Sequence, residues 1–139
     1  MASYVKFQPF VEHLAEKVHN LGSDQLAIAL CNTAPTATEG VLADLTQVSY
    51  TNCSSRNLTT STSAQTAGTY KLVLADLVLT ATGGSVGPFR YVVIYNDTAV
   101  SPATDALIAY FDYGSSITLL DTETLTIDFD ASAGVLTIA

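Results

Sequence analysis

The side chains most able to do acid–base or metal chemistry are the two histidines, His13 and His19, which lie in the segment EHLAEKVH. A zinc-protease helix places two histidines four residues apart with a glutamate directly after the first. The six-residue spacing here puts His13 and His19 on opposite sides of a helix, so we predict no metal site. A Ser-His-Asp site would also need one of these histidines, and the chain lacks a nucleophile-elbow motif. The sequence therefore predicts no catalytic site and no cofactor.

Arg90 stands inside the apolar segment FRYVVIY, where an unpaired buried charge would be costly. Three aspartates interrupt other apolar strands and are candidate partners: Asp76, Asp112 and Asp128. We expect a structural ion pair between Arg90 and one of them. An arginine that binds a ligand is the alternative.

Carboxylates recur near the C-terminus, at Asp121, Glu123, Asp128 and Asp130. Two opposed carboxylates are required for glycoside hydrolysis, but neighbours in sequence need not face each other in space. The chain has no Trp for a sugar-binding cleft and no calcium-loop pattern. We interpret these groups as solvated charges on a strand and its turn.

The glycine-rich stretch GGSVGP at 83–88 could be a phosphate-binding loop. Such a loop must continue into a helix through Gly-Lys-Ser/Thr or lie between a strand and a helix. Here a run of β-branched and aromatic residues follows, so the glycines predict a turn that leads into a central strand, 89–96. Alternation along that strand places Phe89 with Tyr91, Val93 and Tyr95 on one face, opposite Arg90, Val92 and Ile94.

Two further groups of side chains concern surface contacts and redox state. Tyr50, Tyr110 and Tyr113 are candidate surface aromatic contacts, as a glycan-binding loop cluster would need. The N-terminus lacks a signal-peptide pattern, and the longest apolar runs are too short to span a bilayer. We therefore expect synthesis in a reducing cytoplasm, with Cys31 and Cys53 unpaired.

The overall balance of charges limits the partners. The chain has 139 residues, 5 Lys and Arg against 13 Asp and Glu, and a formal net charge of −8. Contact with phosphates needs clustered cations, so we expect no binding to nucleic acid or to an anionic membrane. Charged residues make up only 13% of the chain, which suggests that part of the surface is neutral or covered by a partner.

These residues must be positioned by a mainly all-β domain. Residues 9–21 (PFVEHLAEKVHNL) have helical periodicity and end before Gly22. The expected strands are 25–32, 70–79 (two short strands or one with a bulge at Asp76), 89–96, 106–113, 116–120, 124–129 and 135–138. The segment 33–69 is the least regular, with a short helical turn in 41–48 and either a solvated strand or a loop in 56–65. We predict one domain, 1–139, an antiparallel sandwich, jelly-roll-like or barrel, with 1–8 as a candidate N-terminal arm.

Several of these segments resemble small structural proteins of tailed bacteriophages. They are YKL at 70–72, TATGG at 80–84, FRYVVIYNDT at 89–98 and LIAYFDYGSSITL at 107–119. The family most similar is that of head decoration (cement) proteins. This resemblance implies a non-enzymatic virion protein that binds the major capsid protein on the outside of the head, often as a homotrimer. A receptor- or glycan-binding module of a tail or head fibre is the alternative.

Overall fold

Nine strands and one short helix make up the chain in a computed structural model that describes residues 2–139. The elements are β1 (Ser3–Lys6), α1 (Pro9–Ala15), β2 (Leu26–Cys31), the 3-10 turn η1 (Leu42–Asp44), β3 (Thr60–Thr66), β4 (Thr69–Leu74), β5 (Leu77–Thr80), β6 (Val86–Asn96), β7 (Leu107–Leu119), β8 (Thr124–Ile127) and β9 (Leu136–Ile138). The prediction of a mainly all-β fold with one short N-terminal helix is confirmed. The barrel alternative is wrong, because no sheet of the described residues closes on itself.

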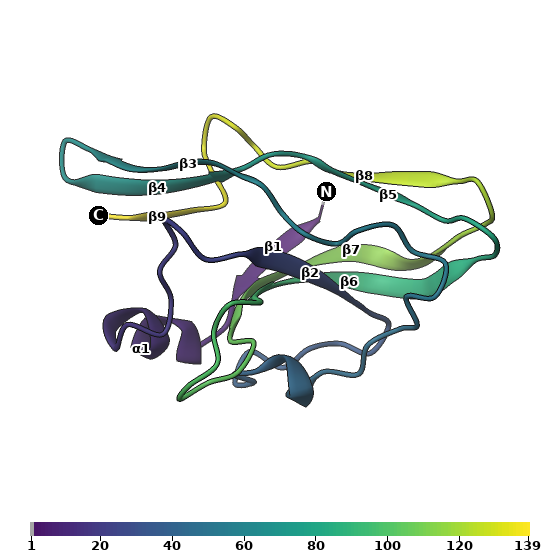
Figure 1. The fold of residues 1–139 in the computed structure, drawn as a ribbon, viewed down its shortest axis with the longest axis horizontal. Helices are drawn as coiled ribbons and strands as arrows, with labels where there is room; N and C mark the ends of the chain where they lie inside the picture. Colours follow the sequence, from purple (N-terminus) through teal and green to yellow (C-terminus); the bar gives the residue numbers. More distant parts are fainter. Residues whose placement is uncertain (1) are drawn as a thin grey trace.

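The strands form two layers. One layer is the four-stranded antiparallel sheet β1-β7-β6-β2, and the other contains the sheets β3-β4-β9 and β5-β8 side by side above it (Figure 1). Leu72 and Leu74 of β4 and Leu79 of β5 pack against the four-stranded sheet in one apolar cluster. The main core therefore lies between the layers, as in a β-sandwich.

β2 shows why the four-stranded sheet has two buried faces. Leu26, Ile28 and Leu30 belong to the core between the layers, whereas Ala27, Ala29 and Cys31 belong to a second cluster on the other face. All six residues of the strand are buried. The 33–48 region contributes Leu42 and Leu45 to that second cluster, so this irregular segment covers the outer face of the sheet.

The free edge of β2 is closed by the segment that follows. The Ile28 N–H donates to the Arg56 carbonyl at 3.0 Å, and the Leu58 N–H donates to the Leu26 carbonyl at 2.9 Å. The Arg56 side chain also donates to the Ile28 carbonyl. These contacts satisfy edge groups that would otherwise offer a pairing site to another chain.

The pairing of β6 with β7 contains a large bulge. Phe89 is opposite Ile117 and Tyr91 is opposite Asp112. Between these two pairs the chain advances by two residues on β6 and by five on β7, so β7 has three extra residues. The extra residues of β7 include Gly114, whose φ is +99°. Because of this irregularity Phe89 joins Val92 and Ile94 in the core between the layers, which corrects the predicted alternation.

The segments predicted as 106–113 and 116–120 form one continuous strand, β7, because the bulge absorbs Gly114 instead of ending the strand. The predicted segment 70–79 is divided into β4 and β5, with Asp76 between them. In the 56–65 region the alternative of a solvated strand holds, since β3 is largely exposed.

The N-terminal region differs most from expectation. The segment 1–8, a candidate arm, contains β1, which pairs with β7, and Phe7, which is fully buried. The helix predicted over 9–21 ends at Ala15, so residues 16–21 are not helical. Lys17 has a φ of +67°, a left-handed conformation that reverses the chain and returns Val18 and His19 to the core.

Candidate functional site

Arg90 and Asp112 form a two-point ion pair across β6 and β7. The Arg90 Nε donates to Asp112 Oδ1 at 2.7 Å and Nη2 donates to Oδ2 at 2.9 Å. The hydrogen bond from Arg90 is the main cause that lowers the pKa of the Asp112 carboxyl. The Arg90 side chain is 37% exposed, so the pair lies at the rim of the sheet and not in the core. Its role is to fix the bulge, since Asp112 Oδ1 also accepts the Gly114 N–H.

Most of the other carboxylates singled out by the sequence accept hydrogen bonds from backbone N–H groups. Asp76 Oδ1 accepts the Phe129 N–H at 2.9 Å, so Asp76 is not a partner of Arg90. Asp128 is exposed and forms no ion pair among the described residues. Three more carboxylates accept backbone N–H groups in turns: Asp121 from Gly83, Glu123 from Leu120, and Asp130 from Ser132 and Ala133.

The three candidate tyrosines lie apart. The Tyr50 hydroxyl donates to Gln47 Oε1, and its ring lies 3.6 Å from the Arg56 guanidinium. Burial raises the pKa of Tyr50 to about 12. Tyr110 packs against the Phe7 ring at 5.2 Å, whereas Tyr113 is 52% exposed. These positions give no shared aromatic surface, so they do not favour the glycan-binding alternative.

The two histidines meet, contrary to the prediction that they lie on opposite sides of a helix. Their ring centroids are 6.1 Å apart because the chain reverses at Lys17. His19 is only 5% exposed. Neither His13 Nδ1 nor His19 Nε2 has a hydrogen-bond partner among the described residues.

Asn96, at the end of β6, connects His19 to the rest of the molecule. Its Nδ2 lies 3.1 Å from His19 Nδ1 and donates to Asp24 Oδ2 at 2.6 Å. Its Oδ1 accepts the N–H groups of Thr98 and Ala99. Asn96 is completely buried, so this side chain fixes the start of the 97–106 loop and the segment that leads into β2.

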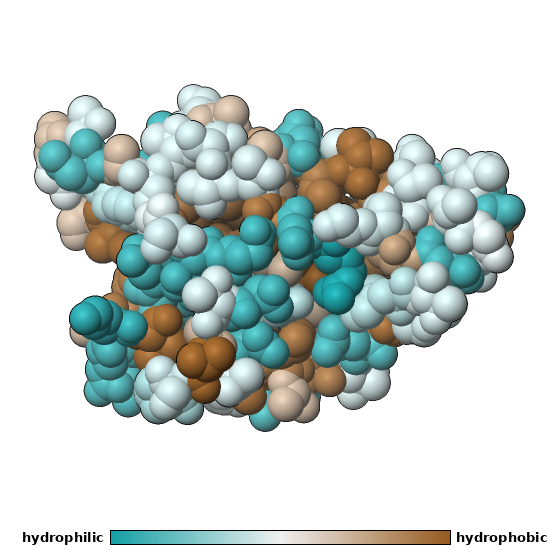
Figure 2. Space-filling model, in the orientation of Figure 1, coloured by the Kyte–Doolittle hydropathy of each residue, from teal (hydrophilic) through white to brown (hydrophobic). Residues whose placement is uncertain are grey.

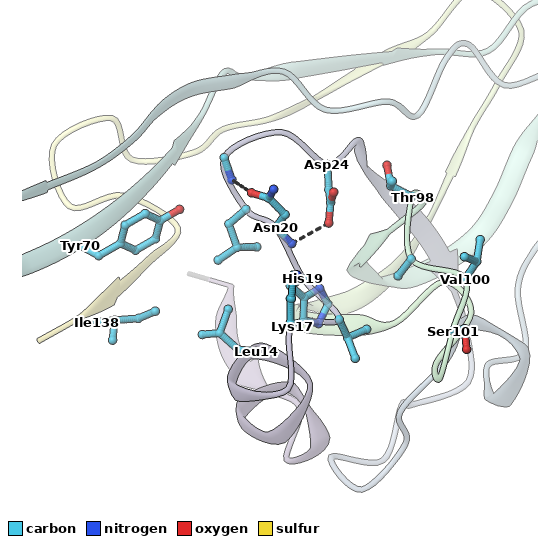
Figure 3. Close-up of a pocket in the computed structure, with 14 residues that line it drawn as sticks. Leu14, Lys17, His19, Asn20, Asp24, Tyr70, Thr98, Val100, Ser101 and Ile138 are labelled. Carbon is cyan, nitrogen blue, oxygen red and sulfur yellow. Dashed lines mark hydrogen bonds between the residues drawn. The ribbon is translucent and has the colours of Figure 1, made fainter.

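His19 and Asp24, the two partners of Asn96, line a cavity of about 560 Å³ between α1, the 97–106 loop and the ends of β4 and β9 (Figure 3). His19 and Asp24 lie near its centre. Tyr70 and Ile138 form one wall, and Thr98, Val100 and Ser101 form the opposite wall. Sequence reasoning did not identify this site, because it depends on Asn96. The only indication in the sequence was the order Asn96-Asp97-Thr98 directly after an apolar strand, which is typical of a turn capped by a side chain.

The electrostatics of the cavity keep His19 neutral at pH 7. The pKa of His19 is lowered to about 4, mainly by burial and to a smaller extent by His13, while Asp24 acts in the opposite direction. Nδ1 of the neutral imidazole faces Asn96, and Nε2 is buried from solvent without a partner among the described residues. No hydrogen bond joins His19 to a serine, threonine or cysteine within residues 2–139. In the same part of the chain, no three His, Cys, Asp or Glu side chains are grouped to hold a metal ion.

Both cysteines are free thiols in the structure. Cys31 is buried on β2, where burial raises its pKa to about 11, and Cys53 lies partly buried in a turn.

The only α-helix in residues 2–139 has seven residues, and no described helix is long and apolar enough to cross a membrane. No protein-family profile matches the chain, and neither a curated protein nor a solved structure is significantly similar to it.

Proposed function

We propose that this chain is a non-enzymatic virion protein of a tailed bacteriophage that binds the outside of the capsid lattice and stabilises the head. The proposed partner is the major capsid protein, and the proposed state is a homo-oligomer, with a trimer favoured. The resemblance of the 70–119 region to phage structural proteins motivates the virion assignment. One feature of the surface carries the binding role.

That feature is an apolar groove between α1 and two edge strands, β1 and β9. Tyr4 and Val11 line one side and Ile138 the other, and these three side chains are 42%, 55% and 42% exposed. Among residues 2–139, Lys6 is the only charged side chain that lines it. Figure 2 shows the molecule hollowed between α1 and the β3-β4-β9 sheet, with hydrophobic surface in the hollow.

An exposed apolar groove of this kind favours contact with another protein surface, because contact removes it from water. β1 and β9 are each the last strand of a sheet, so their outer backbone groups are also available for pairing. A protein bound across subunit boundaries stabilises the assembled shell by mass action and needs no chemistry.

Capsid binding can be tested by mixing the purified chain with undecorated capsids of its own phage and imaging the particles by cryo-electron microscopy. We expect regular extra density at lattice three-fold positions. Bare shells, with the chain absent from intact virions, would contradict the proposal. Bare shells with the chain on the tail or fibres would favour the receptor-binding alternative.

The groove can be tested with a matched pair of variants. Val11→Glu puts a carboxylate into the groove at a helix position that tolerates it, and should abolish oligomerisation and capsid binding. Val78→Glu makes the same change at a side chain that is 52% exposed and lies outside both the groove and the cavity beside His19, and should leave both properties unchanged. Light scattering after gel filtration measures the first property and co-sedimentation with capsids the second.

A further inference from the structure

A second apolar cavity lies between the two layers, under β8. It has a volume of about 200 Å³ and is lined mainly by aromatic and branched side chains. Three phenylalanines contribute, Phe89, Phe111 and Phe129, together with Ile117 and Leu125. An apolar cavity of about 150 Å³ in another protein stays dry and binds benzene. This cavity is therefore large enough for one aromatic ring or one branched aliphatic group.

Polar groups occur only among the residues nearest to solvent. Arg90, Tyr113 and Asp128 all line the cavity, and Tyr113 and Asp128 are exposed. The charge of Arg90 is matched by Asp112 in the ion pair described above. Asp128 has no such partner among the described residues, so the rim carries net negative charge.

An acidic groove continues from this rim. Asp128 and Phe129 line both the cavity and the groove, and the groove also contains Asp76 and Asp130. Lys71 lies close to Asp130 and lowers the pKa of its carboxyl, after the hydrogen bonds from the Ala133 and Ser132 N–H groups. Asp76 and Asp128 have no cation beside them in an ion pair within residues 2–139. A partner that enters the groove is thus expected to carry positive charge.

The size of the cavity identifies the occupant as a side chain. Metabolites and cofactors usually occupy pockets of about 300–1,000 Å³, which exceeds this cavity. Protein interfaces are anchored by single large apolar side chains in buried pockets of this kind, with charged groups around them. The adjoining open groove gives room for the residues on either side of such an anchor.

We propose that this cavity and groove bind a protein partner through one phenylalanine- or leucine-like anchor flanked by lysine or arginine. The anchor enters between Phe111, Leu125 and Phe129, and the flanking cations lie beside Asp128 and Asp76.

Blocked tripeptides are suitable probes, and titrations followed by the backbone amide signals of the full chain measure their binding. Acetyl-Lys-Phe-Lys-amide should shift the amides of Phe111, Leu125 and Ile127. Acetyl-Lys-Ala-Lys-amide lacks the anchor and should not shift them. Acetyl-Glu-Phe-Glu-amide should bind about fivefold more weakly, since an exposed charge pair contributes up to about that factor. Equal binding of the Phe and Ala peptides, or of the Lys and Glu peptides, would overturn the proposal.

Two variants locate the effect. Leu125→Phe fills the cavity and should remove binding of the Lys-Phe-Lys peptide. Asp128→Asn leaves the cavity unchanged and should reduce the preference for the lysine peptide over the glutamate peptide. This second variant tests the proposal even if Leu125→Phe does not fold. Asp97→Asn changes an exposed aspartate that lines neither the cavity nor the groove. It is the matched control and should bind as the natural sequence does. The isolated chain is used throughout, so failure here would leave the capsid-binding proposal untouched.

Discussion

At the scale of single residues, Asn96 makes the most hydrogen bonds of any buried side chain singled out above. Replacement by alanine would remove the hydrogen bonds of this side chain to His19, to the Thr98 and Ala99 N–H groups and to Asp24, which keeps only its bond from the Asn20 N–H. Since each unsatisfied buried group costs about 1–3 kcal/mol, we expect Asn96→Ala to lower the free energy of unfolding by about 3 kcal/mol. Urea unfolding measures this change. Asn57→Ala, at an exposed asparagine, is the control and should change the free energy of unfolding little. Equal decreases in the two variants would contradict a stabilising role for the Asn96 hydrogen bonds.

His19 gives a second prediction at this scale, on pH. Its pKa is about 4 in the folded chain and about 6.5 when unfolded, so the unfolded chain binds a proton that the folded chain excludes. The contribution of His19 to the free energy of unfolding is therefore fully present above pH 6.5 and is lost as the pH falls from 6.5 toward 4. We expect a loss of about 2 kcal/mol, which is less than the full shift implies because the ring borders an open cavity.

The comparison of two variants isolates this effect from the titration of carboxylates. In His19→Gln the slope of stability between pH 6.5 and 4 should flatten. In His13→Gln the slope should decrease only in part, because His13 lowers the pKa of His19 and its removal lets that pKa rise. An unchanged slope in His19→Gln would rule out His19 as the group responsible.

At the scale of elements, the start of β6 depends on Gly87. Its φ is +121°, and a Cβ at this position would lie 2.8 Å from the Ile117 carbonyl oxygen. Gly68 also has positive φ, +85°, but nothing lies within 4 Å of a Cβ there. Gly87→Ala should therefore lower the melting temperature clearly more than Gly68→Ala, whose cost is about 1 kcal/mol of backbone strain. Equal shifts would show that contact with β7 is unimportant.

The elements also show what the sequence could and could not predict. β2 was predictable, because its residues alternate between two apolar faces and the strand is apolar throughout. The end of α1 was not, since periodicity continues past Ala15 and Lys17 is not a residue that signals a left-handed turn. The bulge in β7 was missed because a glycine between two apolar runs predicts a turn as readily as a bulge.

At the scale of the whole molecule, the candidate sites were hidden because they join segments that are far apart in the chain. The cavity of Figure 3 brings His19 and Asp24 beside Thr98 and Tyr70. The apolar cavity joins Ala2 to β6, β7 and β8. The ion pair could be predicted from the sequence, since only three aspartates interrupt apolar strands. The choice of Asp112 among them required the register of β6 and β7.

Cooperativity between the two faces of the four-stranded sheet gives the last prediction. Cys31 lies under the 33–48 segment, whereas Cys53 lies partly exposed in a turn. Burial is the largest cause that raises the pKa of both thiols, to about 11 for Cys31, so a thiol reagent should label native Cys53 slowly and Cys31 far more slowly.

In Cys53→Ser, labelling of Cys31 reports only opening of the sheet. Because Ala29 and Ile28 tie both faces to the same strand, we expect the free energy of that opening to equal the free energy of global unfolding. A markedly smaller value would show that the 33–48 segment detaches from the sheet while the core between the layers remains folded.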